Sequence, residues 1–323
     1  MSGTPVVSSH ATMDQEAESA FAWCRDVTRR EARNFYYGLR LTPEPKRSAI
    51  FAVYAWMRAA DDIVDDEDVS REKRRETLDQ FRSCTDAVFS ALPVEPDATR
   101  AWDPRLWQAF RAAVEAYRLD PADFHDVFTG LTDDIETDSD GTTPLAPRYR
   151  TREELEAYCY SVASTVGLIC VRIWGVQEGA DFDEVRTLAI RRGLAFQLTN
   201  ILRDLAEDFA IRRVYIPGEV FDEHGLTPED LVAWRHPERC EALVHDVGAW
   251  ARRSYEGSQS LERMLHPESV PAMWAMTRIY SDLLEVILRD PSRLFSGQRI
   301  RLAGYQKAAI GLRAFVRARR SRA

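Results

Sequence analysis

Apolar side chains recur every three or four residues over most of the chain, a spacing that is typical of helices. Alternating apolar and polar residues, which would indicate strands, form no convincing run. Prolines and glycines separate the helical stretches, but no segment has the composition of a flexible interdomain linker. The pattern therefore predicts an all-α fold in a single domain. Helices are predicted just ahead of residue 61 and at 105–119, 153–174, 181–209, 240–264 and 270–289.

Two acidic clusters, 61–65 and 204–208, follow helical patterns, and each contains two aspartates four residues apart. Residues at this spacing share a helix face, so Asp61 lies beside Asp65 and Asp204 beside Asp208. Like charges at this spacing mildly destabilise a helix, which favours a cation near each pair. If both faces turn towards one cavity, they form a cage of oxygen ligands suited to Mg²⁺, which usually shares its remaining ligands with substrate phosphates. The alternative for either pair alone is a solvated helix face.

Polar side chains in register with the two clusters extend this interpretation. Gln197 and Asn200 share the stripe of Asp204 and add amide oxygens. Asp62 is rotated by about 100° from Asp61, so it is not a preferred ligand. Side chains suited to donate to diphosphate oxygens flank both clusters: Tyr54, Arg58, Arg213 and Tyr215.

Apolar and aromatic residues near the clusters could hold an apolar substrate that ends in diphosphate. The aromatic candidates are Phe35, Tyr36, Tyr37 and Trp56. A stripe of small apolar residues, 162–167, fits either tight helix packing or the wall of a lipid tunnel, and both readings stay open. Asp134 belongs to an acidic run that is interpreted mainly as a solvated turn, with a border position at the site as the alternative.

Charge and composition exclude several classes of protein. The net charge of −9 argues against a nucleic-acid binder. Five cysteines without a CxxC pair suit a reducing compartment, so a cytoplasmic location is expected. No secretory signal is expected at the N-terminus, and no apolar run reaches the length of a membrane span. Histidine spacing fits no zinc hydrolase or di-iron bundle, and no nucleotide-binding glycine motif follows a strand. The arginines after residue 312 predict either a solvated basic tail or a weak contact with anionic lipid headgroups.

Five motifs give the chain a resemblance to the squalene/phytoene synthase family over residues 20–310. Residues 34–43 resemble the N-terminal S-F-Y…L-P element, with Asn34 in place of Ser and Thr42 in place of Leu. Residues 54–65 match the family's Y-A-x-x-R-x-x-D-D-x-x-D helix, and residues 158–167 match Y-C-x-x-V-A-x-x-V-G. Residues 197–208 resemble Q-L-x-N-I-L-R-D-x-x-E-D almost letter for letter. Residues 213–217 then match R-[IV]-Y-[LI]-P, although Arg212 stands where a Gly commonly precedes that element.

This resemblance implies an isoprenoid-synthase helical bundle with a central cavity, at 20–310, between a disordered tail at 1–19 and an Arg-rich tail at 311–323. It implies a prenyltransferase that condenses two prenyl diphosphates head-to-head through a cyclopropyl diphosphate. Two or three Mg²⁺ ions are expected with the substrate diphosphate, whereas NADPH is possible but not indicated, and the oligomeric state stays open. The implied metal ligands are Asp61, Asp65, Asn200, Asp204 and Asp208, of which the four aspartates are also the catalytic residues. The implied substrate-binding residues are Phe35, Tyr54, Arg58, Val162, Val166, Gly167, Gln197, Arg213 and Tyr215.

Residues 166–175 look more like bacterial squalene or presqualene diphosphate synthases, which favours farnesyl diphosphate as substrate. A phytoene synthase that uses geranylgeranyl diphosphate is the alternative. A terpene cyclase or chain-elongating prenyltransferase would show a different second acidic motif. A non-catalytic helical lipid-binding scaffold is a more remote alternative. Release of an apolar product implies a peripheral contact with a membrane, at its inner face.

Overall fold

A computed structural model describes residues 8–66, 68–92, 101–137 and 144–320, with the side chains of 8–15, 33–35 and 318–320 left out. Contacts divide the chain into two compact units, Met1–Pro121 and Ala122–Ala323. Helices dominate both units, and the described residues form no strand, only an isolated bridge between Val176 and Leu265. The all-α prediction is therefore confirmed.

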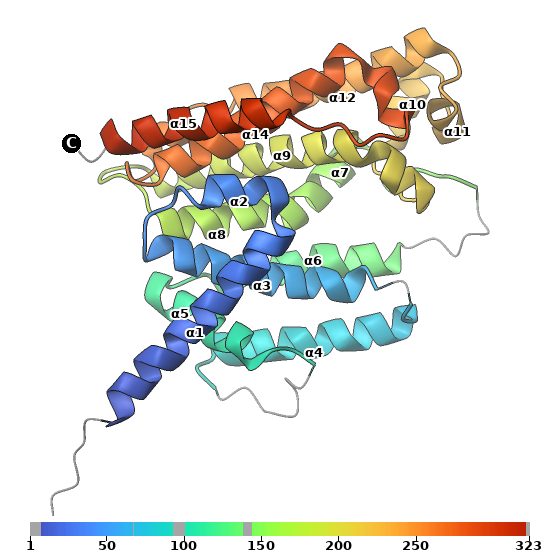
Figure 1. Ribbon diagram of the computed structural model, residues 1–323. Helices are drawn as coiled ribbons and strands as arrows, with labels where there is room; N and C mark the ends of the chain where they lie inside the picture. The colour runs from blue at the N-terminus through green and yellow to red at the C-terminus, as the bar shows by residue number, and fades with distance from the viewer. Residues whose placement is uncertain (1–7, 67, 93–100, 138–143, 321–323) are drawn as a thin grey trace, which may run out of the picture. The chain divides into compact units, whose positions relative to one another are not determined.

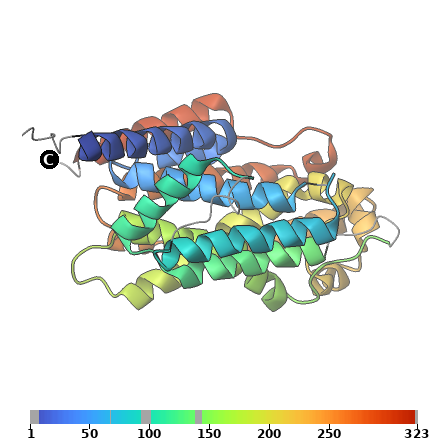
Figure 2. The same ribbon diagram turned by 90° about the horizontal axis from the view of Figure 1, so that it is seen from below.

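The described residues of the first unit form five helices, which Figures 1 and 2 show from two sides. Helices α1, α3 and α5 pack against one another, and α4 lies along α3 and α5. Their core is aromatic: Trp56 is fully buried, stacks on Phe110 and donates from its indole nitrogen to the Thr85 hydroxyl over 3.0 Å. Trp56 is thus a packing residue and not the cavity residue that its sequence position suggested. The helices are α1 (Ser8–Glu31), α2 (Arg33–Leu39), α3 (Lys46–Val64), α4 (Arg71–Phe89) and α5 (Pro104–Tyr117).

The second unit is arranged around α9, a helix of 29 residues. Helices α8, α12 and α14 all pack on α9, and α15 lies along α14 (Figure 1). The elements are α6 (Pro121–Glu136), α7 (Arg152–Cys159), η1 (Tyr160–Ser164), α8 (Thr165–Trp174), α9 (Phe182–Ala210), α10 (Gly218–His224), α11 (Pro228–Val232), α12 (Pro237–Glu256), α13 (Leu261–Met264), α14 (Val270–Arg289), η2 (Pro291–Phe295) and α15 (Gly304–Arg320).

Two neighbouring residues fix α9 in the second unit. Gly193 lies so close to η1 that a Cβ atom there would be 2.5 Å from the Ser164 Cα. Arg192 is 2% exposed and donates to the Ser258 hydroxyl and to Glu262, at 2.9 and 2.7 Å. A buried cation is stable only with such partners. The polar residues later on α9 are therefore carried by a well-anchored helix.

The segment from α7 to α8 is one continuous helical stretch with a π-helical turn, η1, in its middle. The stretch, Arg152–Trp174, is the one described helix that is long and apolar enough to cross a membrane, with 56% of its apolar window buried. A core helix passes the same test, and this one packs on α9. All five cysteines are free and buried.

The predicted chain ends lie partly outside the described residues. Helix α1 begins at Ser8, and α15 extends to Arg320. Helical structure thus covers much of the two ranges, 1–19 and 311–323, that were expected to be tails. The assignment of 20–310 to one domain stays a prediction.

Candidate active site

In the first unit, the residues of the first acidic cluster lie at the C-terminal end of α3. Asp61 and Asp65 are exposed and one helical turn apart. Arg58 forms an ion pair with Asp62, which lies between Asp61 and Asp65 in the sequence. Burial opposes the charge on Arg58, but the carboxylates of Asp62, Asp61 and Asp65 outweigh this effect and raise its pKa. That Asp62 is not a preferred ligand stays a prediction.

The end of α3 is held in place by the next helix. Arg74 of α4 is buried and donates to the Val64 carbonyl over 2.7 Å, which satisfies a carbonyl that the helix end leaves without a partner. Tyr54 lies further back on α3 and is half-buried. The side chain of Phe35 lies outside the described residues.

In the second unit, α9 carries the second acidic cluster. Arg203 pairs with Asp204 through two nitrogens, and Arg299 pairs with the same carboxylate. Arg299 also reaches Glu207 at 3.2 Å. Asp204 is therefore held by two guanidinium groups, one from its own helix and one from the segment that follows η2.

Asp208 lies one turn after Asp204 and is half-buried. Burial and the charge of Asp204 raise its pKa to about 7, while Arg213 and Arg148 oppose the shift. A carboxyl group with such a pKa gains charge readily when a cation is added nearby. A cation beside Asp208 would therefore stabilise the charged form of this carboxyl group.

Asn200 lies one turn before Asp204. Its amide nitrogen donates to Gln197 over 3.3 Å, and its buried Oδ1 atom has no hydrogen-bond partner. An unsatisfied buried oxygen is unfavourable unless a ligand is bound to it. Asn200, Asp204 and Asp208 share one face of α9, and their oxygens fit the ligand preference of Mg²⁺. Among the described residues, no three acidic, His or Cys side chains form a metal-binding group.

A second polar cluster surrounds Asp134 of α6, which is 8% exposed. Arg148 donates to Asp134 over 2.7 Å, and the Tyr158 hydroxyl lies 3.0 and 3.1 Å from its two oxygens. Burial raises the pKa of Asp134, whereas Arg148 and Arg213 oppose the shift. Because Arg148 and Arg213 act on both Asp134 and Asp208, the two clusters belong to one electrostatic neighbourhood.

Three stacked tyrosines form one side of this cluster. The Tyr149 and Tyr158 rings lie 5.3 Å apart, and the Tyr158 and Tyr215 rings 5.4 Å apart. The Arg148 guanidinium lies 5.2 Å from the centre of the Tyr215 ring. Burial raises the pKa of all three phenols, so they donate hydrogen bonds and remain uncharged.

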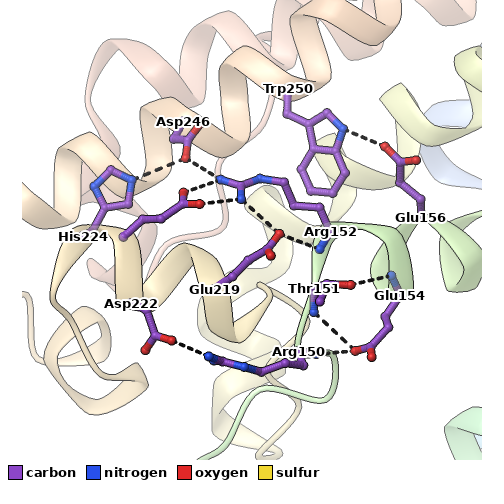
Figure 3. A network of polar contacts seen from close by, with 11 residues as sticks. Arg150, Thr151, Arg152, Glu154, Glu156, Glu219, Asp222, His224, Asp246 and Trp250 are labelled. Carbon is purple, nitrogen blue, oxygen red and sulfur yellow. Dashed lines mark hydrogen bonds and ion pairs between the residues drawn. The ribbon is translucent and has the colours of Figure 1, made fainter.

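Backbone pairing sets the positions of these residues. The Arg148 amide donates to the Val214 carbonyl over 2.9 Å, and the Gly218 amide donates to Tyr149 at the same distance. Beside this pairing, Arg152 binds Glu219, Glu223 and Asp246, at 3.0, 2.6 and 3.0 Å (Figure 3). The segment that carries Arg148 and Tyr149 is thus fixed to α10 and α12.

Of the predicted site residues, Gln197 accepts a hydrogen bond from the Asn200 amide. Arg213 lowers the pKa of Asp208, and the Tyr215 hydroxyl lies 3.5 Å from an Asp134 oxygen. Val162, Val166 and Gly167 are half-buried on η1 and α8, and Val162 also packs closely against Gly130 of α6. Sequence reasoning missed Arg148, Tyr149 and Arg299, and it undervalued Asp134. The acidic run at 133–138 was the only signal for any of these residues.

Residues 28–306 match the family model described as squalene/phytoene synthase, and the chain belongs to that family. The protein is therefore an all-α prenyltransferase. It is 32% identical to a 15-cis-phytoene synthase from Synechocystis over 90% of this chain and 83% of the relative. It is 33% identical to a presqualene diphosphate synthase from Sinorhizobium fredii over 86% of this chain and 91% of the relative. A crystal structure of a dehydrosqualene synthase superposes with a TM-score of 0.78 and 23% identity, over 95% of this chain and 99% of that one.

Proposed function

We propose that the protein is a Mg²⁺-dependent synthase, with 20–310 as its domain, that condenses two prenyl diphosphates head-to-head. The observation that carries this proposal is the face of α9, where the Asn200 oxygen lacks a partner and Asp208 has a pKa near 7. The metal ligands proposed are Asn200, Asp204 and Asp208 in the second unit and Asp61 and Asp65 in the first. When bound, Mg²⁺ would draw electron density from the diphosphate oxygens and so assist departure of that group.

Cationic side chains of this chain bind the diphosphate groups in the proposed reaction. Arg58, Arg148, Arg213 and Arg299 present guanidinium groups, which pair well with phosphate oxygens. Asp134 and Tyr158 hold Arg148 in position. Arg299 pairs with Asp204 in this structure and would be available to the diphosphate if Asp204 held a cation.

Apolar side chains protect the reacting carbons from water. Departure of one diphosphate leaves an allylic cation, and the double bond of the second substrate attacks it. Loss of one proton closes the cyclopropane ring, so that each turnover releases one diphosphate and one proton. Val162, Val166, Gly167 and Phe35 are proposed to line the space for the prenyl chains, and Tyr54, Gln197 and Tyr215 its polar end.

We propose farnesyl diphosphate as the substrate, which gives presqualene diphosphate or a squalene-type hydrocarbon, a hopanoid precursor. This proposal is supported by the relative named presqualene diphosphate synthase. The second candidate, phytoene formation from geranylgeranyl diphosphate for carotenoid synthesis, is supported by the relatives named phytoene synthase. A cytoplasmic location with peripheral membrane contact is proposed for either, and NADPH is needed only if the product is a reduced hydrocarbon.

The test incubates purified protein and Mg²⁺ with each prenyl diphosphate, with and without NADPH, and identifies products by mass spectrometry. Thirty-carbon products are expected from farnesyl diphosphate, with at least a hundredfold loss of rate in Asp204→Asn. Asp222→Asn is the control, because Asp222 is exposed and pairs with Arg150. Phytoene alone would overturn the proposed chain length. No product from either substrate, with Asp204→Asn behaving as wild type, would contradict the proposed synthase.

A further inference from the structure

The outward face of α15 carries an unusual concentration of exposed apolar side chains. Eight large hydrophobic side chains are exposed among the described residues, and four of them lie on this one helix. They are Tyr305, Leu312, Phe315 and Val316, at 77%, 66%, 47% and 43% exposure. Exposed apolar residues that occur singly need no explanation, but a group on one element marks an interaction surface.

The spacing of these residues places them on one side of the helix. Leu312 follows Tyr305 by seven residues and precedes Val316 by four, which is the repeat of a helix face. The opposite side packs on the protein: Ile310 is 5% exposed and Ala314 is fully buried. Helix α15 thus has two apolar faces, of which one is used within the second unit and one is exposed.

Helix α15 is fixed firmly enough to present its outer face. It lies along α14 (Figure 1), and the Arg317 guanidinium stacks over the Trp274 ring at 4.6 Å from the ring centre. This contact adds a cation–π attraction to the burial of Ile310 and Ala314. The exposed stripe is therefore a surface on an ordered helix.

The charge of this part of the chain is opposite to that of the rest. Nine Lys and Arg residues and no Asp or Glu follow Asp290, although the whole chain has a net charge of −9. On α15 itself, Arg313 is exposed and follows Leu312 directly, whereas Lys307 is half-buried and Arg317 stacks over Trp274. Basic residues beside an apolar helix face are typical of helices that lie in the interface of an anionic membrane.

We infer that the outward face of α15 docks the protein on the surface of an anionic lipid bilayer. Tyr305, Leu312, Phe315 and Val316 enter the headgroup region, and the neighbouring basic residues pair with lipid phosphates. A symmetric contact between two α15 helices is disfavoured, because it would bring two basic surfaces together. The inference rests on the peripheral membrane contact proposed above, but not on the condensation chemistry.

Vesicle flotation without substrate or Mg²⁺ tests this surface directly. Wild-type protein is expected to float at least tenfold better with phosphatidylcholine vesicles that contain 30% phosphatidylglycerol than with phosphatidylcholine alone, and to be released by high salt. The double variant Leu312→Ser and Val316→Ser is expected to lose at least tenfold in binding, and Arg313→Gln several-fold. The matched controls, Leu92→Ser with Val232→Ser and Arg263→Gln, change equally exposed residues outside α15 and are expected to bind as wild type.

Each other outcome counts against the inference. Equal flotation of wild type and the α15 double variant, or no flotation at low salt, would overturn it. A wild-type dimer that the α15 variant dissociates, seen by light scattering, would assign the face to a second copy instead. Product formation in detergent is measured in parallel and should not change in the α15 variant, so failure of membrane docking is distinguishable from failure of the proposed synthase.

Discussion

Asp208 of α9 titrates differently from an exposed aspartate. Burial and the negative charge of Asp204 raise the pKa of Asp208 to about 7, far above the ordinary value of 3.8. The folded protein therefore binds a proton at Asp208 more tightly than the unfolded chain does. The stability from this proton is fully present below about pH 4 and is lost as the pH rises through about 7.

The variant Asp208→Asn tests this titration. Between pH 5 and 8 the metal-free wild type is expected to lose on the order of 1–4 kcal/mol of stability through this group, whereas the variant keeps a flatter profile. Mg²⁺ needs the charged carboxylate, so its stabilising effect on wild type should be larger at pH 8 than at pH 6. Thermal unfolding at both pH values, with and without Mg²⁺, measures these effects. A variant with the wild-type pH profile would contradict this role of Asp208.

Single residues also show which contacts of the candidate site could be predicted from the sequence. The spacing of Asn200, Asp204 and Asp208 follows from the period of a helix, so their shared face was predictable. Arg299 lies 95 residues from its partner Asp204, and no local pattern reveals such a contact. Arg212, in the position where the family commonly has Gly, adopts a positive φ of 63° at the end of α9. Glycine is favoured there because it adopts this conformation without strain.

At the scale of elements, a network of ion pairs holds the start of α7. Arg152 lies beside three carboxylates, and its side chain is 27% exposed (Figure 3). The hydrogen bonds that Arg152 donates to Glu223 and Glu219 outweigh burial and raise the pKa of Arg152. A group with several charge-assisted partners contributes more than an isolated surface pair does.

Substitutions of Arg152 and of its neighbour Arg150 compare the stabilisation by this network with that by an ordinary surface ion pair. Arg152→Gln is expected to lower the free energy of unfolding by about 1–3 kcal/mol, because it leaves three carboxylates near one another without their cation. Arg150→Gln is the matched control, since Arg150 is 67% exposed and pairs with an exposed Asp222, and about 0.5 kcal/mol or less is expected. Chemical denaturation of both variants gives the comparison. Equal losses would show that the Arg152 network adds nothing beyond a surface ion pair.

The helices themselves were largely predictable, because each has one buried apolar face. The stretches predicted at 105–119, 181–209 and 270–289 agree closely with α5, α9 and α14. The prediction at 153–174 was also helical, but it did not contain the π-helical turn η1. Such a turn depends on packing against other elements, here the close approach of Gly193 to Ser164, and hydrophobic spacing does not encode it.

For the molecule as a whole, each compact unit carries one acidic cluster: Asp61 and Asp65 in the first, and Asp204 and Asp208 in the second. The matches over nearly the full chain agree with a family fold that includes both units. The family and both acidic clusters could be predicted from the sequence, because the residues that identify them lie in short motifs. The length of the prenyl substrate could not be predicted, because it depends on residues other than the proposed metal ligands.

Metal and diphosphate together should stabilise the whole chain. Inorganic diphosphate with Mg²⁺ is expected to raise Tm by on the order of 5 °C at a hundredfold excess over Kd, more than either alone, and EDTA should reverse the shift. Asp61→Asn and Asp204→Asn should each reduce the shift if both clusters bind the ions. Differential scanning calorimetry measures the effect. A full shift in Asp61→Asn would show that the first cluster takes no part.

The π-helical turn at Tyr160–Ser164 marks a place where this helix can change its length. A π turn holds about one residue more than the α-helical turn it replaces. Deletion of one residue there would restore a regular α-helix and leave the residues on either side near their present faces. Deletion of one residue from α8 would instead rotate the residues on one side of it by about 100°. Lineages that keep this fold should therefore accept a one-residue deletion at the π turn more readily than in α8.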